Sequence, residues 1–317
     1  MVEGSSSDVS IYEGNIFVGS EDEHIYSIDA VTGEKNWKYN VGTPVLSTPA
    51  VSNGKVYFGS SGGYIYALDS ETGKRIWKYE VSGDIHSSPT VNNGFLYVGT
   101  GTFGGGQKVH AIDTNKGTKK WSLKLGGSIV SSPAVVDGMV YISCMDGNIY
   151  AVDASKGLIS WSFQTEHEVA SSPAVYNGVV YVGSGDSNLY ALRSEEGKLK
   201  WKFDTDEYIA GSPAVDSNTV YIGTGVYRRN SSVYAVDAAT GSEKWSFSTQ
   251  SSVTSSVSLS SGILYASTWA GKLFALDAST GRKIWKFTSG GRFSSPSVVG
   301  SRVFISDYRV FSLGGPL

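Results

Sequence analysis

The segment ALDASTGRKIW, residues 275–285, occurs seven times with small changes in the chain of 317 residues. The tryptophans that end the seven copies follow one another at intervals of 40, 44, 40, 40, 44 and 40 residues. A regular interval of this length is typical of a repeat array and not of a catalytic signature. The seven tryptophans are Trp37, Trp77, Trp121, Trp161, Trp201, Trp245 and Trp285.

Each repeat predicts four short antiparallel strands. A Ser-Ser-Pro step such as residues 87–89 comes first, and a turn residue, usually glycine, follows five positions after the proline. That turn opens a run such as KVYFGS at residues 55–60, which alternates aromatic and β-branched residues, and a second run such as YIYALD at 64–69 is its hairpin partner. The Asp and Gly of the repeated motif then form a tight turn before the tryptophan strand.

Four-stranded units repeated about every 40 residues are typical of β-propeller blades. The second strand occurs eight times, from the run at Phe17 to the run at Phe304, whereas the tryptophan strand occurs seven times. We therefore predict an all-β, eight-bladed β-propeller of four-stranded antiparallel blades, formed as a single domain by residues 1–317.

The last blade is predicted to be incomplete or irregular. Its tryptophan would fall near position 322, beyond the last residue, while Ser7 to Tyr12 already align with a first strand. Residues 1–6 are long enough to cross a blade or to form a strand, but not both. We expect that an upstream segment of the native protein was removed.

Composition and charge narrow the classes of partner. The formal charge is −3, and there is no basic cluster, so we expect no nucleic acid partner. No apolar stretch of membrane-spanning length occurs, so we expect no membrane insertion, and the start MVEGSSSDVS is unlike a secretory signal. Cys144 is the single cysteine, which excludes an internal disulfide and an all-cysteine metal site. We expect a monomer.

The seven motif tryptophans are predicted to have a structural docking role. Their fixed place after each turn suggests that the indole packs over a turn glycine and donates its N–H to a backbone carbonyl. The alternative is that the tryptophans form a stacking site for an aromatic cofactor, but this does not explain why every repeat has a tryptophan at the same place. No serine of the Ser-Ser-Pro steps is in a setting typical of a nucleophile.

The pattern A-x-D-x-x-T-G-x-x-x-W resembles the tryptophan-docking repeat of the PQQ-like propellers, which include quinoprotein alcohol dehydrogenases and the propeller lipoprotein of the outer-membrane barrel-assembly machinery. The resemblance covers essentially the whole chain. The chain departs from the pattern at Arg193, which replaces the aspartate, and at Lys116, Lys156 and Glu196, which replace the threonine. The resemblance implies an extracytoplasmic protein, periplasmic or at the cell surface, whose targeting segment is absent from this chain.

Catalytic members of this family hold PQQ beside a disulfide between adjacent cysteines and bind calcium through Glu, Asn and Asp. This chain has one cysteine and no D-x-D-x-D-G loop. We therefore predict no catalytic, cofactor-binding or metal-binding residue, and PQQ and calcium stay as the cofactors of an alternative hypothesis. The sequences around Asp146 and Asp186 are interpreted as hairpin turns.

A candidate binding face is predicted from the loops. Two kinds of connection are expected on the same face: those from the second to the third strand, and those from the fourth strand to the next repeat. Two connections of the first kind, starting at Gly99 and Gly223, are longer than the others by four residues. Exposed aromatic side chains mixed with arginine are typical of partner-binding surfaces, although each residue alone could be a solvated loop residue. The candidate residues are Glu166, His167, Asp206, Glu207, Tyr227, Arg228, Arg229 and Trp269.

The histidines do not predict a metal site. His24, His86 and His167 share the candidate face, but their positions within the repeat differ and no pair has a recognised ligand spacing. His110 takes the tyrosine position of a third strand and is expected to be packed. Asn230 begins a glycosylation sequon, which favours an extracytoplasmic location.

Three hypotheses for the function follow. The first is a non-catalytic propeller that binds a protein or small ligand through its long-loop face. The second is a PQQ-dependent dehydrogenase or a quinone-binding sensor. The third is a structural module of a larger surface protein.

Overall fold

The computed structural model describes residues 7–101, 107–225, 231–307 and 309–314, and all of their regular secondary structure is β-strand. Within these ranges, thirty-one strands form eight sheets, each antiparallel and in chain order. These sheets are the blades of the eight-bladed β-propeller that the sequence predicts, and the last blade has three strands in the described part of the chain. Both predictions are confirmed. The loop residues Tyr227, Arg228 and Arg229 lie outside the described residues.

The chain divides into two compact units, which are described in turn. Unit 1 consists of Met1–Val140, Asp153–Leu158 and Val299–Leu317, and unit 2 consists of Tyr141–Val152 and Ile159–Val298. Unit 1 contains blades 1, 2 and 3 and most of blade 8, and unit 2 contains blades 5, 6 and 7 and most of blade 4.

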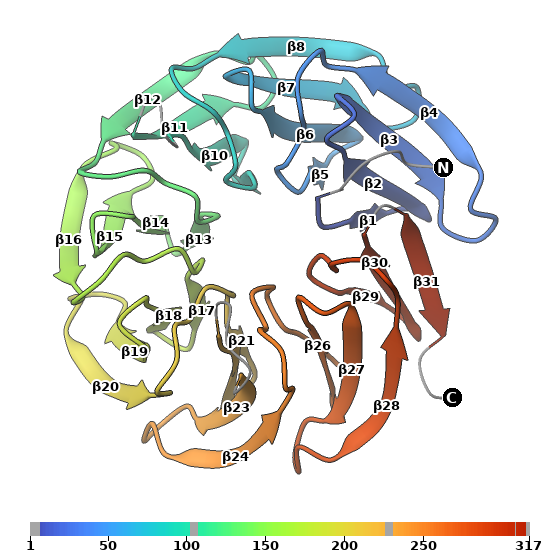
Figure 1. The fold of residues 1–317 in the computed structure, drawn as a ribbon. Coiled ribbons are helices and arrows are strands. Elements are labelled where there is room, and N and C mark those ends of the chain that lie inside the picture. The colour runs from blue at the N-terminus through green and yellow to red at the C-terminus, as the bar shows by residue number, and fades with distance from the viewer. Residues whose placement is uncertain (1–6, 102–106, 226–230, 308, 315–317) are drawn as a thin grey trace. The chain divides into compact units, whose positions relative to one another are not determined.

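Blades 1 to 3 and blade 8 contain the strands β1 (Ser10–Tyr12), β2 (Asn15–Gly19), β3 (His24–Asp29), β4 (Lys35–Asn40), β5 (Ala50–Ser52), β6 (Lys55–Ser60), β7 (Tyr64–Asp69), β8 (Arg75–Glu80), β9 (Thr90–Asn92), β10 (Phe95–Gly99), β11 (Lys108–Asp113), β12 (Lys119–Lys124), β29 (Ser297–Val299), β30 (Arg302–Ser306) and β31 (Val310–Gly314). In unit 1, blade 1 lies between blade 2 and blade 8 (Figure 1). Blade 8 packs on blade 1 through a cluster that includes Val9, Tyr26 and Phe304, and Ser306 Oγ donates a 2.8 Å hydrogen bond to the carbonyl of Ser7.

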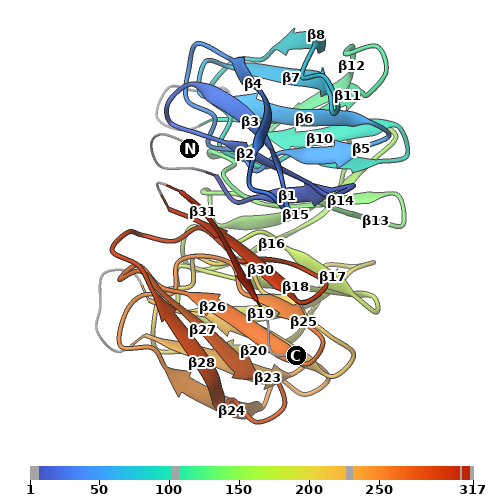
Figure 2. The same cartoon turned by 90° about the vertical axis from the view of Figure 1, so that its right-hand side faces the viewer.

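Blades 4 to 7 contain the strands β13 (Ala134–Val136), β14 (Met139–Ser143), β15 (Asn148–Asp153), β16 (Ile159–Gln164), β17 (Ala174–Tyr176), β18 (Val179–Gly183), β19 (Asn188–Arg193), β20 (Leu199–Asp204), β21 (Ala214–Val215), β22 (Thr219–Gly223), β23 (Ser232–Asp237), β24 (Glu243–Ser248), β25 (Ser258–Ser260), β26 (Ile263–Ser267), β27 (Lys272–Asp277) and β28 (Lys283–Thr288). The strands β25 to β28 lie side by side in one twisted sheet, as Figure 2 shows.

The middle strands of each blade supply its core. In blade 2 the burial pattern of β6 is one half-buried residue followed by five buried ones, and β7 has four buried residues in a row. A strand that is buried on both faces has a continuous run of apolar residues, and VYF within β6 and YIYAL within β7 are such runs. The fourth strand β8 alternates exposed and half-buried residues because only one of its faces packs on the blade.

The motif tryptophans of blades 1 to 6 each join their blade to the following one. Trp37 Nε1 donates a 3.0 Å hydrogen bond to the carbonyl of Ser70, and its ring covers Gly73. Gly73 has φ +68°, and a Cβ atom there would lie 2.6 Å from the ring of Trp37, so this position requires glycine. The same hydrogen bond is made, at 2.8 to 3.1 Å, by Trp77, Trp121, Trp161, Trp201 and Trp245.

Each motif tryptophan also has a fixed partner within its own blade. Its ring centroid lies 5.7 to 5.9 Å from that of an aromatic residue on the second strand, as for Trp285 and Tyr265 at 5.9 Å. On the third strand, a small residue stands directly opposite the tryptophan, for example Ala275 opposite Trp285. The small residue leaves room for the indole between the two strands.

The turn before each tryptophan strand is built by its aspartate. In blade 1, one carboxylate oxygen of Asp29 accepts hydrogen bonds from the amides of Val31 and Thr32, at 2.8 and 2.7 Å. These amides hold the pKa of the Asp29 carboxyl below its usual value. Arg193 cannot make these bonds, yet the backbone bonds of the same turn persist there, with Gly197 N donating to the carbonyl of Arg193 at 2.8 Å. The turn thus tolerates loss of its aspartate.

Candidate functional site

The candidate site lies in unit 2, where two connections and a turn meet. The connections follow β16 and β20 and span residues 165–169 and 205–209, and the turn, residues 184–187, joins β18 to β19. Gly185 N donates to the carbonyl of Glu168 at 3.0 Å, and Thr205 Oγ1 donates to the carbonyl of Ser187 at 2.8 Å. We call these three segments the acidic loop face.

The backbone of the acidic loop face is held by side chains that recur in the repeat. Thr165 Oγ1 is hydrogen-bonded to the carbonyls of Gly147 and His167, at 2.9 and 2.6 Å. Thr205 makes the equivalent pair with Ser187 and Glu207, at 2.8 and 2.7 Å. These buried threonines fix the connections, so the acidic side chains beside them project from an ordered backbone.

Five carboxylates lie on this face, and a sixth, Asp204, ends β20 directly before it. The exposed ones are Glu166, Asp204 and Asp206, and Glu207, Glu168 and Asp186 are half-buried. Asp186 is tied to the first connection because one of its oxygens accepts a 3.0 Å hydrogen bond from the amide of Glu166. Burial raises the pKa of the Asp186 carboxyl, but hydrogen bonds from Tyr190, Glu166 and Asn188 lower it overall, so Asp186 is a carboxylate at neutral pH.

His167, Glu168 and Tyr208 form a contact group at the centre of the face. His167 Nδ1 pairs with a carboxylate oxygen of Glu168, and the other oxygen accepts a 3.2 Å hydrogen bond from the hydroxyl of Tyr208. The rings of His167 and Tyr208 meet edge to face with their centroids 6.4 Å apart. Burial and then the charge of Glu168 raise the pKa of Tyr208 to about 12, so its hydroxyl keeps its proton and donates.

Gly185 allows this packing. A Cβ atom at Gly185 would lie 2.7 Å from His167 Nδ1 and 2.7 Å from the ring of Tyr208. Any larger residue in the turn would separate the two rings.

Trp269 lies on the turn between β26 and β27 of blade 7. Its amide donates a 2.8 Å hydrogen bond to the carbonyl of Ser252, and the side chain is 39% exposed. The guanidinium carbon of Arg292 lies 3.6 Å from the centroid of the indole, which is a cation–π contact. An exposed tryptophan stacked on an arginine is a typical anchor of a protein interface.

The structure brings together some of the predicted residues and adds others. Glu166, His167, Asp206 and Glu207 lie within the acidic loop face, and Trp269 lies on another loop of unit 2. Arg292 is not among the residues predicted for the candidate face. The only signal for it is its place directly after Gly290 and Gly291 in a connection of the candidate type.

The two aspartates that the sequence analysis assigned to hairpin turns do form such turns. Asp146 accepts hydrogen bonds from the amide of Asn148 and the hydroxyl of Tyr150, at 2.9 and 2.7 Å. Asp186 makes the same pair of bonds with Asn188 and Tyr190. Within the described ranges, no group of three or more His, Cys, Asp or Glu side chains is arranged to hold a metal ion. No described helix is long and apolar enough to cross a membrane.

Comparison with known proteins gives matches to the whole fold. The family model described as outer membrane protein assembly factor BamB matches residues 2–90, 63–228 and 229–313. A search of curated protein sequences found no significant match.

Three similar solved structures represent three kinds of protein. BamB from Moraxella catarrhalis is 17% identical, with a TM-score of 0.81 over 98% of this chain and 96% of that chain. The computationally designed Ika8 protein is 15% identical, with a TM-score of 0.86 over 98% and 96% of the two chains. The quinohemoprotein alcohol dehydrogenase from Comamonas testosteroni is 16% identical, with a TM-score of 0.79 over 96% of this chain and 70% of that chain. Likenesses at this identity show the fold alone.

Proposed function

We propose that this chain, which belongs to the family of PQQ-like β-propellers described as outer membrane protein assembly factor BamB, is a non-catalytic scaffold that binds a protein through its loops in unit 2. The proposal places it outside the cytoplasm. The observation that carries it is the acidic loop face, where five carboxylates lie on a backbone held by Thr165 and Thr205.

The charge of this face selects the chemistry of the partner. Glu166 and Asp206 are exposed, and no lysine or arginine lies in the three segments of the face. Clustered like charges attract a surface of opposite sign and raise its rate of association. We therefore expect a partner with a basic segment, together with an apolar or aromatic patch that contacts Trp269.

The test is site-specific crosslinking in the organism that makes the protein. A photoreactive phenylalanine analogue replaces Trp269 in one protein and Leu199 in a second, since Leu199 is an exposed apolar residue on β20. We expect Trp269 to capture a distinct protein from the cell envelope fraction, and Leu199 to capture none of it. Capture of the same proteins from both positions would contradict the proposal.

Charge reversal separates specific from general attraction. Glu166→Lys with Asp206→Lys should abolish the crosslink from position 269. The matched control, Glu195→Lys with Glu243→Lys, changes the net charge equally at two exposed residues away from the acidic loop face and should leave the crosslink unchanged. Equal loss of the crosslink in both proteins would mean that the net charge of the protein, and not the acidic loop face, determines binding.

The dehydrogenase hypothesis is tested on the same protein. Titration with PQQ and calcium, followed by tryptophan fluorescence, measures cofactor binding, and dye-linked oxidation of alcohols and aldoses measures turnover. Saturable turnover would replace the scaffold proposal with the enzymatic one.

A further inference from the structure

A cavity of about 600 Å³ lies within unit 2, between blade 6 and blade 7. On the blade 6 side it is lined by residues 216–219 and by Lys244, and on the blade 7 side by residues 261–263, residues 277–279 and Ile284. Its volume lies in the range that is usual for small-molecule sites. None of these residues belongs to the acidic loop face, so the cavity is a separate feature.

The turn between β21 and β22 gives the cavity a carboxylate that the repeat does not supply. Among the eight blades, blade 6 alone has an acidic residue, Asp216, directly before the two residues of this turn. Those two residues are not at positive φ, whereas their counterparts in blade 5, Asn177 and Gly178, have φ 47° and 70°. Asp216 holds the turn instead, since its carboxylate accepts hydrogen bonds from the amides of Asn218 and Thr219 at 3.0 and 2.8 Å.

The hydroxyl of Tyr221 connects the two sides of the cavity. It lies 3.2 Å from the carboxylate of Asp216 and 3.2 Å from the carbonyl of Ala278, the residue after Asp277. Burial raises the pKa of Tyr221 to about 12, and the charges of Asp216 and Asp277 add to this effect, whereas a hydrogen bond with Thr219 opposes it. Carboxylates from both blades therefore act on the same hydroxyl.

The motif aspartate of blade 7 lacks the lysine that its counterpart in blade 6 has. Lys244, the residue before Trp245, places its Nζ 3.5 Å from Asp237 Oδ2. The corresponding residue of blade 7 is Ile284, which is 45% exposed. Within the described residues, no lysine or arginine forms an ion pair with Asp277.

The charge of Lys244 is already balanced within blade 6. Besides Asp237, its Nζ donates to the carbonyl of Asn218 at 2.7 Å and to Thr219 Oγ1 at 3.0 Å. The acceptors of Lys244 are thus all in blade 6, and the carboxylates of Asp216 and Asp277 remain as the excess charge of the cavity.

Asp277 is a carboxylate at neutral pH. The amides and hydroxyls of Ser279 and Thr280 all donate to its Oδ1, at 2.7 to 3.0 Å. These hydrogen bonds, led by that of the Ser279 hydroxyl, lower the pKa of the Asp277 carboxyl. The other oxygen, Oδ2, accepts none of these bonds and can accept one from a ligand.

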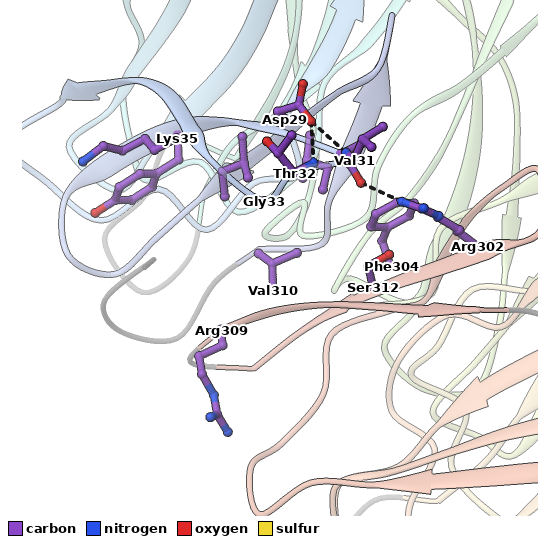
Figure 3. A pocket seen from close by; sticks show the side chains of 14 residues that line it. Asp29, Val31, Thr32, Gly33, Lys35, Arg302, Phe304, Arg309, Val310 and Ser312 are labelled. Atoms are coloured by element: carbon purple, nitrogen blue, oxygen red, sulfur yellow. Dashed lines mark hydrogen bonds between the residues drawn. The ribbon is translucent and has the colours of Figure 1, made fainter.

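The chain itself places a guanidinium beside the corresponding turn of blade 1. Arg302 Nη1 donates to the carbonyl of Ala30 at 3.1 Å, and Ala30 follows Asp29 as Ala278 follows Asp277 (Figure 3). Arg302 is the first residue of β30, which is the place that Thr219 has in β22. A groove between two blades therefore has room for a guanidinium next to this turn.

We propose that the cavity between blades 6 and 7 binds a small ligand that carries a guanidinium group on an aliphatic stem. The guanidinium donates to the carboxylates of Asp216 and Asp277, and the stem packs on Ile284. A planar guanidinium has five N–H donors, so it can serve two carboxylates at once.

Butylguanidinium is the probe, and butylurea, which has nearly the same shape and no charge, is its control. The full chain is titrated with each compound, and the amide resonances of Asn218 and Gly262 are followed in NMR spectra. We expect saturable shifts with butylguanidinium and at least about a tenfold weaker affinity for butylurea, because charged donors make the stronger hydrogen bonds to carboxylates. Equal affinity for both compounds, or no saturable shift with butylguanidinium, would overturn the proposal.

A lysine at position 284 should close the site. Ile284→Lys gives blade 7 the residue that pairs with the motif aspartate in blade 6, so it should weaken the binding of butylguanidinium at least about tenfold. Ile76→Lys is the matched control, since Ile76 has the same place in blade 2, is 44% exposed and changes the net charge equally. Unchanged binding by the Ile284→Lys protein, or equal loss in both proteins, would contradict the proposed site.

Removal of one carboxylate charge tests the site in a second way. Asp277→Asn keeps a side-chain oxygen for the turn and should weaken binding at least about tenfold. Asp69→Asn makes the same change in the turn of blade 2 and should leave binding unchanged. If the Asp277→Asn protein bound butylguanidinium as tightly as the Asp69→Asn protein, Asp277 would not be part of a site and the proposal would be wrong.

Discussion

Protonation of His110 should control how the stability of the fold changes with pH. His110 lies on β11 at the position that Phe274 takes in blade 7, and it is 4% exposed. Its Nε2 is 3.5 Å from Thr100 Oγ1, and within the described residues its Nδ1 has no hydrogen-bond partner. Burial, and then the charges of Lys108 and Lys119, lower the pKa of His110 from 6.5 to about 4.

The sign and size of the effect follow from this shift. The unfolded chain takes up a proton near pH 6.5, whereas the native chain takes it up only near pH 4, so acidification between these values favours unfolding. The full shift corresponds to about 3 kcal/mol of unfolding free energy, and about 2 kcal/mol of it is lost between pH 7 and pH 5. Below about pH 4 both states are protonated and no more is lost through this group.

The assay is urea unfolding at pH 7 and pH 5, followed by tryptophan fluorescence, with His110→Phe as the reference. We expect the wild type to lose about 2 kcal/mol more than the variant over this interval. Burial also lowers the pKa of His86, but both proteins contain it, so its contribution cancels. The imidazole resonances of His110 in NMR spectra give the native pKa directly. Equal losses in the two proteins, or a titration near pH 6.5, would refute the reasoning.

Two further predictions concern the glycine turns and the hydroxyl of Tyr150. Gly73→Ala and Gly33→Ala both place alanine at a positive φ, which should lower the free energy of unfolding by about 1 kcal/mol. Only Gly73→Ala also pushes against Trp37, so urea unfolding should show a further loss of about 1 to 3 kcal/mol for this variant. Equal losses in the two variants would mean that the indole does not pack on Gly73. Tyr150→Phe should lower stability by about 1.5 to 3 kcal/mol at pH 7, since Tyr150 donates to the Asp146 carboxylate at 2.7 Å. Burial raises the pKa of Asp146, but hydrogen bonds led by that of Tyr150 lower it overall, so the difference between variant and wild type should shrink as the pH falls below 3.8. A difference that stays constant down to pH 3 would contradict this account.

Most of the fold could be predicted from the repeat. The apolar alternation around Phe17 and Phe304, the Asp-Gly turn and the recurring tryptophan are local signals, and each recurs often enough to predict eight sheets and a short last blade. The candidate face was harder to predict, because its residues occur once each and follow no period. Glu166 and Trp269 stood out as charged or aromatic residues in loops, whereas nothing local distinguished Arg292.

The sequence by itself determined the strands, their order and the residue that follows each turn, because these depend on side-chain patterns within one repeat. Only the tertiary structure decided which groups meet across repeats: Trp37 with Gly73, Arg292 with Trp269, and the amide of Glu166 with Asp186. Such contacts depend on how one twisted sheet packs on the next, which no single repeat encodes.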